Sequence, residues 1–443
     1  MEGWQIDFDK AHSTRSGSSQ TVWTLICSGL LFVSVAIGFY VNTGTSSTSQ
    51  PAPYDLLLIV TMALHFAVGL KFSRRLRTPA ILWGLFLLGY GFSGIGAVYI
   101  DRVGDFLLVS VYLISSMLFF AAVVAWDPKR NLAIIWWAYT FAAVFAATLG
   151  VTAYFGLLPN ADAFLLYSRV KSTFNDPNVF GPFLVAPTLF LIFRLSMSAN
   201  RRDLLLIPLV GVLFLGILLS FSRGAWGNLI ASGGLFLVLT WMTATSARQI
   251  GRLTLAVGLV VAMGACVVAW ALTSDVVAEL FEQRFALTQS YDVSSDGGRF
   301  AVQEEALNVV LSNPLGIGPS QWAKIAGADP HNVYLNVFLA GGWTSGVALI
   351  ALYVLTLLAG LRSCFVASPF QGLQIVALSA LTGHIAEAFI IDIDNWRHVY
   401  LLLGLVWGGI VYVQDREMKQ AERRVATPSP SGKLIPSADG FVI

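Results

Sequence analysis

Long apolar runs separated by polar segments dominate the chain. A helix needs roughly 20 mostly apolar residues to cross a bilayer. Twelve runs are close to that length, at 22–42, 54–72, 79–100, 105–126, 132–157, 179–197, 203–221, 225–246, 253–273, 335–360, 372–391 and 396–414. Because the runs are continuous and do not alternate with polar positions, the pattern excludes a transmembrane β-barrel. We therefore predict an all-α polytopic membrane bundle of about twelve transmembrane helices.

The polar segments predict the rest of the domain organisation. The longest of them, residues 274–334, is expected to be a loop domain outside the membrane that contains amphipathic helices. It separates the first nine transmembrane helices (22–273) from the last three (335–414). Residues 1–21 are predicted to be a cytoplasmic tail. Residues 415–443, which are charged and then rich in Pro and Ser, are predicted to be a disordered cytoplasmic tail.

The composition supports this prediction and excludes other classes of protein. Apolar residues make up 56% of the chain and charged residues only 12%, whereas soluble domains carry roughly 25% charged residues. Polar side chains are too few to cover a water-facing surface, which excludes a soluble enzyme, a disordered protein and a nucleic-acid binder. The three cysteines are scattered and form no CxxC pair, so neither a disulfide framework nor a thiolate metal site is predicted.

Lys and Arg are distributed unequally between the two sides of the predicted bundle. With an even number of helices both termini lie on one side, and 19 of the 27 Lys and Arg residues then fall on that side. Cytoplasmic loops carry such an excess, so both termini are predicted to be cytoplasmic. The other eight face outward, against the bias, and they are the candidates for chemistry.

Two of the outward segments carry isolated cations. Arg223 is the only charged residue from 204 to 247 and lies between two apolar runs. An Arg at membrane depth costs at least roughly 2.5–3.5 kcal/mol unless it finds a partner or reaches the interface. Arg169 and Lys171 precede the helix-start signal at Asp176, and capping does not explain them. The simpler alternatives are a hairpin Arg that marks the interface and ordinary contact with lipid headgroups.

A third cation lies inside the long polar loop. Arg299 follows two glycines and opens a predicted amphipathic helix, 299–311. The N-terminus of a helix favours a bound phosphate because free amides and the helix dipole point at it. This motif is weak alone, because many loop helices look the same. The apolar residues expected mainly on one side of that helix are Phe300, Ala306, Leu307, Val310 and Leu311.

A histidine marks the junction between the polar loop and the next apolar run. His331 is a candidate general base because its side chain titrates near neutral pH. Asp329 is two residues away and could orient it, and Asn332 is a further supporting candidate. The simpler alternative is a histidine that packs at the start of the next helix. Arg397 is the last supporting candidate, within an ionisable group for which ion pairing is the simpler explanation: His384, Glu387, Asp392, Asp394, Arg397 and His398.

These residues carry more weight together than singly. Three arginines and a histidine, from four separate segments, are predicted to lie on one side of the membrane. Arg matches phosphate oxygens with two parallel hydrogen bonds, so converging arginines suit a diphosphate. No GxxxxGK[ST] nucleotide-binding loop is present. The lone Asp392-Ile393-Asp394 is not evidence for an Asp-x-Asp metal motif.

Four of these segments resemble a known superfamily, that of O-antigen ligases and of O-antigen and exopolysaccharide polymerases, which are integral membrane glycosyltransferases. The similar stretches are RVKSTFNDPNVFG (169–181), SFSRG (220–224), GRFAVQEEALNVVLSNPLGIG (298–318) and HNVYLNVFLAGGWTSG (331–346). Together they span residues 169–346 in the order that the family shows, and the rest of the chain matches only as transmembrane spans.

The resemblance implies a periplasmic glycan transfer in the bacterial inner membrane. Its implied donor is a glycan on a polyprenyl (undecaprenyl) diphosphate carrier, and its acceptor is a saccharide or glycolipid. Transfer proceeds with inversion and without a metal or other cofactor. Arg169, Arg223, Arg299 and Lys171 would bind the diphosphate, and His331 would position or deprotonate the acceptor hydroxyl. Membrane lipids and other polysaccharide-assembly proteins are the further implied partners, and no nucleic acid is implied.

Several alternatives remain open. The acceptor is a growing polysaccharide in a polymerase and lipid A–core in a ligase. Gly342 is followed by a second glycine only at Gly346, one position later than is typical of the ligases, which weakens assignment to the ligase branch. Gly342-Trp343 and the stretch 394–398 (DNWRH) look more like exopolysaccharide polymerases. A secondary transporter or lipid flippase would also have about twelve helices. The absence of an internal repeat and the gathering of charges at one face argue against it. A scaffold protein would make no use of the Arg and His residues.

Overall fold

A computed structural model describes residues 18–37, 53–197, 200–271, 273 and 298–426 of the chain. The predicted disordered tail, 415–443, is wrong in its first part, because residues 415–426 continue the last helix, Arg397–Ala426. The rest of that tail lies outside the described residues, as does the first part of the predicted loop domain, 274–297. Within the described residues nearly all secondary structure is helical.

Each of the twelve predicted spans overlaps one helix, or in one case two consecutive helices. The helices are α1 (Ser18–Ala36), α2 (Pro53–Ala67), α3 (Arg77–Ile95), α4 (Ile100–Trp126), α5 (Pro128–Tyr154), α6 (Pro177–Phe183), α7 (Val185–Met197), α8 (Leu206–Leu219), α9 (Arg223–Met242), α10 (Ala247–Ala271), α15 (Val333–Cys364), α16 (Gln371–Glu387) and α17 (Arg397–Ala426).

The connections contain the remaining elements. They are the 3₁₀ turns η1 (Arg74–Leu76), η2 (Ala161–Phe164) and η3 (Arg201–Leu205), the strands β1 (Leu165–Leu166) and β2 (Arg169–Val170), and the helices α13 (Arg299–Ser312) and α14 (Trp322–Ala326). The two strands pair antiparallel and form a short hairpin before α6.

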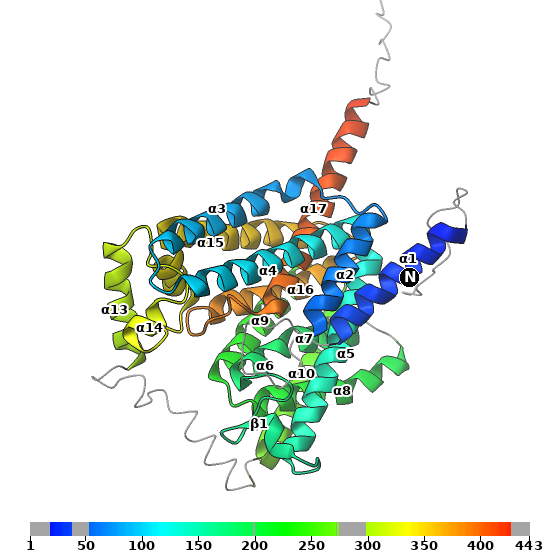
Figure 1. Ribbon diagram of the computed structural model, residues 1–443. Coiled ribbons are helices and arrows are strands. Elements are labelled where there is room, and N and C mark those ends of the chain that lie inside the picture. The colour runs from blue at the N-terminus through cyan, green and yellow to red at the C-terminus, as the bar shows by residue number, and fades with distance from the viewer. Residues whose placement is uncertain (1–17, 38–52, 198–199, 272, 274–297, 427–443) are drawn as a thin grey trace, which may run out of the picture.

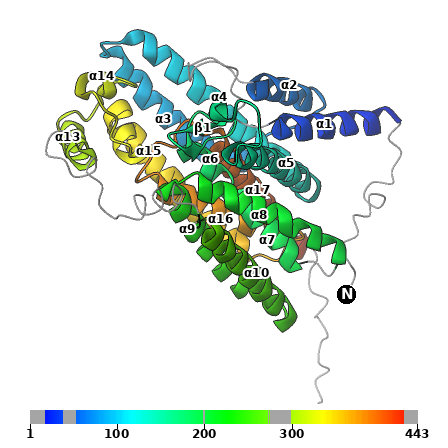
Figure 2. The same cartoon turned by 90° about the horizontal axis from the view of Figure 1, so that it is seen from below.

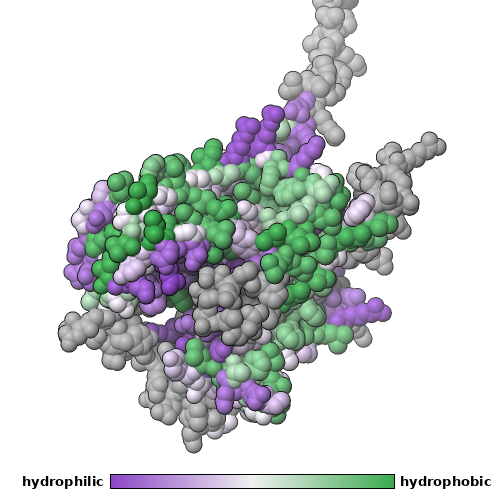
Figure 3. Space-filling model, viewed as in Figure 1, coloured by the Kyte–Doolittle hydropathy of each residue, from purple (hydrophilic) through white to green (hydrophobic). Residues whose placement is uncertain are grey.

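The length and hydropathy of the helices confirm the predicted fold class. Among the described residues, nine helical stretches are long and apolar enough to cross a membrane, and α1 and α2 are shorter apolar helices. Hydrophobic residues cover much of the flank of the bundle, whereas hydrophilic residues gather near α13 and α14 and at the base of α17 (Figure 3). This distribution is that of a polytopic membrane bundle.

Small residues allow the central helices to approach closely. A Cβ atom on Gly404 of α17 would lie 2.7 Å from Cβ of Phe120, and one on Gly408 would lie 2.5 Å from Cβ of Val124, both on α4. In the same way α15 packs along α3, and α16 along α9 (Figure 1). Helix α10 packs on α7 at the edge of the bundle (Figure 2). Close backbone approach is the usual way in which membrane helices gain packing energy.

The two ends of the bundle differ in what covers them. Helices α13 and α14 lie at the end where α3 finishes and α15 begins, and the C-terminal part of α17 projects at the other end (Figure 1). At that other end Arg75 pairs with Asp415 of α17 at 2.5 Å. Arg299, which opens α13, and His331, directly before α15, therefore lie at the α13 end of the bundle.

The amphipathic helix at 299–311 is present, but the predicted composition of its buried face is wrong in part. Val302, Ala306 and Val310 are the buried positions, which repeat every four residues along α13. Phe300, Leu307 and Leu311 are 45–62% exposed. The prediction gathered all apolar residues on one face, whereas the contact of α13 with α15 covers only a narrow stripe.

Helix α15 is broken near its first third. Gly342 has φ 70° and ψ −174°, which interrupts the helix, and the loop after α13 occupies the break. The amides of Ile317 and Gly318 donate to the carbonyls of Leu339 and Ala340, and the amide of Trp343 donates to the carbonyl of Pro314. Loop backbone thus supplies the hydrogen bonds that the helix lacks here. The segment that follows His331 is fixed to the segment that follows α13.

Candidate functional site

The first two motifs, 169–181 and 220–224, are in direct contact. Arg169 on β2 is buried, at 7% exposure, and its Nε donates to the carbonyl oxygen of Ser220 at 2.8 Å. Its Nη2 donates to Oδ1 of Asn178 at 2.7 Å. A Cβ atom on Gly181 would lie 2.6 Å from Oγ of Ser220, so only glycine fits there. Arg169 therefore fixes the turn that leads into Arg223.

Arg223 is the first residue of α9, and its surroundings explain why a helix begins there. The Ser222 hydroxyl accepts a hydrogen bond from the amide of Ala225 at 3.3 Å, which caps the helix. Phe221 before it adopts φ 47°. The half-buried Arg223 thus stands at a helix N-terminus, where the dipole adds to its positive charge. Lys171, also half-buried, lies in the loop just after β2.

The other two motifs, 298–318 and 331–346, are also joined to each other. Gln303 of α13 donates from Nε2 to the carbonyl of Pro330 at 2.9 Å, next to His331. Arg299 is the first residue of α13, as predicted from the sequence, but its side chain lies outside what the structure describes. Its predicted contact with the diphosphate therefore stays a prediction.

His331 is exposed and faces a carboxylate. Its side chain is 55% exposed, and Nδ1 lies 3.4 Å from Oδ2 of Asp392, an ion pair when the imidazole is protonated. His331 adopts φ 47°, a left-handed conformation that costs a residue other than glycine free energy. Asn332 accepts a hydrogen bond from the amide of Leu335 at 3.1 Å and caps α15. The cap explains Asn332 without a role in the chemistry.

Three carboxylates form an acidic group beside the histidine, and only Asp329 among them was a supporting candidate from the sequence. Partial burial and the negative charge of Asp392 raise the pKa of Asp329, and His331 lowers it. Burial, followed by the charge of Asp392, raises the pKa of Asp394 to about 7. Asp392 thus lies between the histidine and two acidic groups, and it is the residue that pairs with His331.

The segment after α16 connects the two pairs of motifs. The amide of Val333, at the start of α15, donates to the carbonyl of Ala388 at 3.0 Å. Glu387 directly precedes Ala388, and its Oε1 lies 2.8 Å from the position that a Cβ atom on Gly224 would take. A few residues later Asp392 meets His331. Residues 387–392 therefore contact both the Arg223 helix and the His331 helix, which the sequence spacing did not indicate.

Arg397, a supporting candidate, is engaged with another carboxylate. Its Nε and Nη2 donate to the two carboxylate oxygens of Asp55 on α2, each at 2.6 Å. This paired, mostly buried geometry joins the start of α17 to α2. A bidentate Arg–carboxylate pair is already neutralised, so Arg397 is explained as a structural link between helices.

Strained backbone is concentrated in these motifs. Among the described residues, seven non-glycine residues have positive φ, and five of them lie in the candidate segments or directly before one: Tyr167, Ser168, Ser172, Phe221 and His331. Each of the first four lies within two residues of Arg169, Lys171 or Arg223. Such conformations persist only where the surrounding structure enforces them, and they are common at functional sites.

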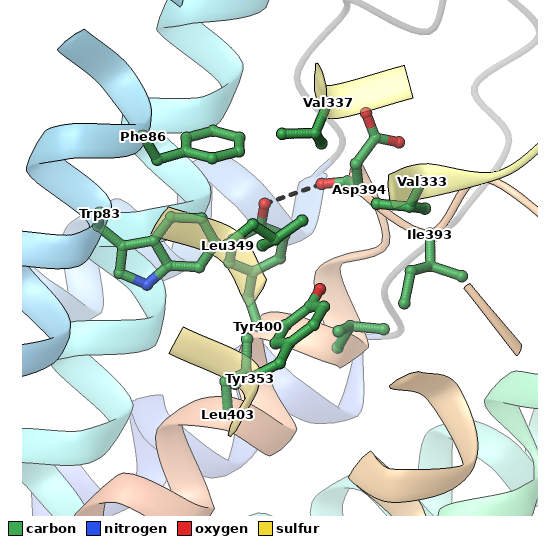
Figure 4. A pocket seen from close by; sticks show the side chains of 11 residues that line it. Trp83, Phe86, Val333, Val337, Leu349, Tyr353, Ile393, Asp394, Tyr400 and Leu403 are labelled. Carbon is green, nitrogen blue, oxygen red and sulfur yellow. Dashed lines mark hydrogen bonds between the residues drawn. The ribbon is translucent and has the colours of Figure 1, made fainter. Parts of the chain in front are cut away.

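A small pocket lies beneath the first two turns of α15. Its walls include the aromatic residues Trp83, Phe86, Tyr353 and Tyr400, which are all buried, and Asp394 at one side (Figure 4). The Tyr400 hydroxyl donates to the backbone carbonyl of Asp394 at 2.8 Å, while the Asp394 carboxylate points away from the tyrosines. The pocket is part of the packing that holds Asp394 beside the His331 loop. No group of three or more metal-ligating residues occurs among the described residues.

Comparison with known families found a match to the middle of the chain. Residues 208–353 match the family model described as O-antigen ligase, which confirms the superfamily resemblance for that region. The matched region begins in α8, ends within α15, and includes Arg223, Arg299 and His331; Arg169 and Lys171 lie before it. A search of curated proteins found no match.

Proposed function

From the membership of residues 208–353 in the O-antigen ligase family, we propose that this protein transfers or polymerises glycan from a polyprenyl diphosphate carrier. The acceptor is a saccharide, at the periplasmic face of the bacterial inner membrane. Glycan transfer of the ligase or polymerase type is the general activity of the family, and the carrier, the face and the residue roles are our proposals.

The observation that carries the proposal is the bridge formed by residues 387–392. Through it the Arg223 helix and the His331 loop belong to one assembly. Arg223 stands at a helix N-terminus beside the Arg169 turn, which suits an anion. His331 is an exposed potential base in the loop before α15, and Asp392 of the same bridge contacts it. A donor with a charged leaving group and an acceptor hydroxyl need these two functions close together.

The residues support an inverting displacement. The acceptor hydroxyl oxygen attacks the anomeric carbon, and the new glycosidic C–O bond forms as the bond to the diphosphate breaks. Polyprenyl diphosphate leaves with the electron pair, and Arg223, Arg299 and Lys171 balance its charge. The hydroxyl proton passes to His331. With Nδ1 directed at Asp392, Nε2 is the basic nitrogen.

Arg169 and Asp392 are assigned indirect roles. Arg169 holds the Ser220 turn and the following Arg223 in place through its bond to the Ser220 carbonyl. Asp392 orients the imidazole and stabilises its protonated form. The second oxygen of Asp392 is buried without a hydrogen-bond partner among the described residues, so the carboxylate retains a free acceptor position.

The orientation rests on the two ends of the bundle. The cationic turn at η1 and its ion pair with α17 lie at the end opposite α13. An end rich in Lys and Arg is expected in the cytoplasm. The α13 and His331 end then faces the periplasm, and both termini are cytoplasmic.

The test is reconstitution of the purified protein in lipid nanodiscs with a polyprenyl diphosphate oligosaccharide and defined acceptors. A new glycosidic bond of inverted configuration, with release of polyprenyl diphosphate, is expected. Supplying carrier-linked repeats and lipid A–core as alternative acceptors separates polymerase from ligase. Movement of the donor across vesicles without any new glycosidic bond would overturn the proposal in favour of a flippase.

A further inference from the structure

A cluster of buried polar groups lies where α16 ends against α9. The side chains of His384 and Glu387 are 0% exposed, and Asn228 and Ser232 of α9 are also buried. Buried ionisable residues in a membrane bundle are costly and are often functional. The transfer chemistry described above makes no use of this cluster.

Hydrogen bonds fix the geometry of the cluster. Asn228 Nδ2 donates to Glu387 Oε2 at 2.7 Å and lies 3.1 Å from Nδ1 of His384. The Ser232 hydroxyl donates to Oδ1 of Asn228 at 2.8 Å. A Cβ atom on Gly383 would collide with Ser232 and Asn228, so α16 and α9 approach closely here. Asn228 therefore contacts His384, Ser232 and Glu387, and its hydrogen bond fixes the Glu387 carboxylate.

One carboxylate oxygen remains directed at the start of α9. Oε1 of Glu387 is buried and has no hydrogen-bond partner among the described residues. It lies 2.8 Å from the position of a Cβ atom on Gly224, the residue after Arg223. Glycine at this position of the 220–224 motif leaves room for the Glu387 carboxylate, and a Cβ atom there would displace either the carboxylate tip or the helix start.

The charges explain why a carboxylate is buried there. The N-terminus of α9 carries a partial positive charge from the helix dipole, and Arg223 adds a full one. A buried carboxylate beside the first turn of α9 complements this positive end of the helix. A negative group against the first turn stabilises that turn in its starting position.

Building on the proposed function, we propose that Glu387 is a positioning residue for Arg223: its carboxylate, held by Asn228, fixes the first turn of α9 and thereby the place of the guanidinium that receives the diphosphate. Glu387 itself does not touch the donor. A neutral replacement leaves α9 free to shift, and a misplacement of about 1 Å is enough to weaken an oriented contact greatly.

The test measures binding of sugar-free polyprenyl diphosphate to the full-length protein in nanodiscs. Glu387→Ala and Gly224→Ala are expected to weaken binding roughly tenfold, and Glu387→Gln, which keeps the shape without the charge, by less. The matched control is Gln374→Ala, which removes a buried polar group from the same helix, where Gln374 bonds to Ser363 and to the Val406 carbonyl. The control is expected to lower the melting temperature without weakening binding.

The outcomes separate this inference from the proposed function. Arg223→Gln is measured in parallel; if it leaves binding unchanged, the proposed function itself fails. If Arg223→Gln weakens binding while Glu387→Ala and Gly224→Ala stay within about twofold of the wild type, the positioning role fails alone. The same holds if the two variants lose binding only in proportion to stability, as Gln374→Ala does.

Discussion

The Arg223 side and the His331 side of the candidate site are built in opposite ways. Arg169, Ser222 and Glu387 are buried, and they support Arg223 from β2, the α8–α9 turn and α16. His331 is 55% exposed, lies in a loop, and has Asp392 as its ionic partner. The first side is preorganised by packing, which suits a fixed anion site, whereas the second can exchange protons with its surroundings.

Loss of the base should have the largest effect. Replacing His331 with Ala is expected to lower the rate of glycan transfer by about 10³-fold, within the range for general base catalysis. Binding of polyprenyl diphosphate should be unchanged, because the anion site lies on the other side. Steady-state transfer with purified protein measures the rate. His65→Gln, in α2, is the control histidine and should retain activity. Wild-type transfer by His331→Ala would remove the role assigned here.

Loss of the cation should come next and should act on the donor. Arg223→Gln is expected to lower transfer by about 10²-fold, as removal of one preorganised charge-stabilising donor does. Unlike the histidine variant, it should also weaken donor binding. Arg102→Gln, which removes another predicted outward cation at an exposed position, is the matched control. Equal losses in both variants would mean that general surface charge, and not the α9 terminus, attracts the donor.

Loss of the carboxylate beside His331 should have a moderate effect. Asp392→Asn is expected to lower kcat by about tenfold while the KM for the donor stays the same, since the imidazole loses its orienting partner. Asp392→Glu should recover part of the activity. Asp101→Asn, an exposed acid on α4, controls for charge. A change confined to KM would contradict the assignment of Asp392 to the His331 side.

The last prediction concerns stability and not the rate of transfer. The folded chain keeps a proton on Asp394 up to about pH 7, whereas an unfolded chain releases it near pH 4. Stability therefore falls as the pH rises from about 4 to 7 and is level above that range. Asp394→Asn should remove this slope, an effect of up to about 4 kcal/mol between pH 4 and 7, because one pKa unit corresponds to about 1.4 kcal/mol. Melting curves from pH 5 to 8 test it, with Asp162→Asn as control; an unchanged slope would contradict it.

The sequence predicted the fold better than it predicted the partners within the site. Hydropathy alone predicted helices in all twelve apolar runs, because a helix in lipid must be continuous and apolar, and nine helical stretches among the described residues are long and apolar enough to span a membrane. The position of Arg299 at a helix start and the helix start at Asp176 also followed from local patterns, whereas the Ser222 cap before Arg223 was not predicted. Local patterns can be predicted from a sequence because the residues that cause them lie within one or two helical turns of each other.

Long-range pairings could not be predicted in the same way. Asp329 was the expected neighbour of His331, but Asp392, sixty-one residues away, is its ion-pair partner. Arg397 was a candidate for the site, yet it pairs with Asp55 across 342 residues. The buried face of α13 was partly misassigned for the same reason, since it depends on how much of that helix α15 covers. Each of these three contacts depends on how the helices pack, which cannot be inferred from the local pattern of a single sequence.

The break in α15 at Gly342 has a consequence for how the protein is made. Backbone carbonyls and amides left open at membrane depth cost several kcal/mol each, and here residues 314–318 satisfy them from outside the helix. Residues 333–364 therefore reach full hydrogen bonding only once the loop behind α13, synthesised just before them, has docked. Insertion of α15 and assembly of the His331 end are therefore coupled during biogenesis. A mutation that disrupts the loop at 314–318 is expected to impair the insertion of α15 into the membrane first.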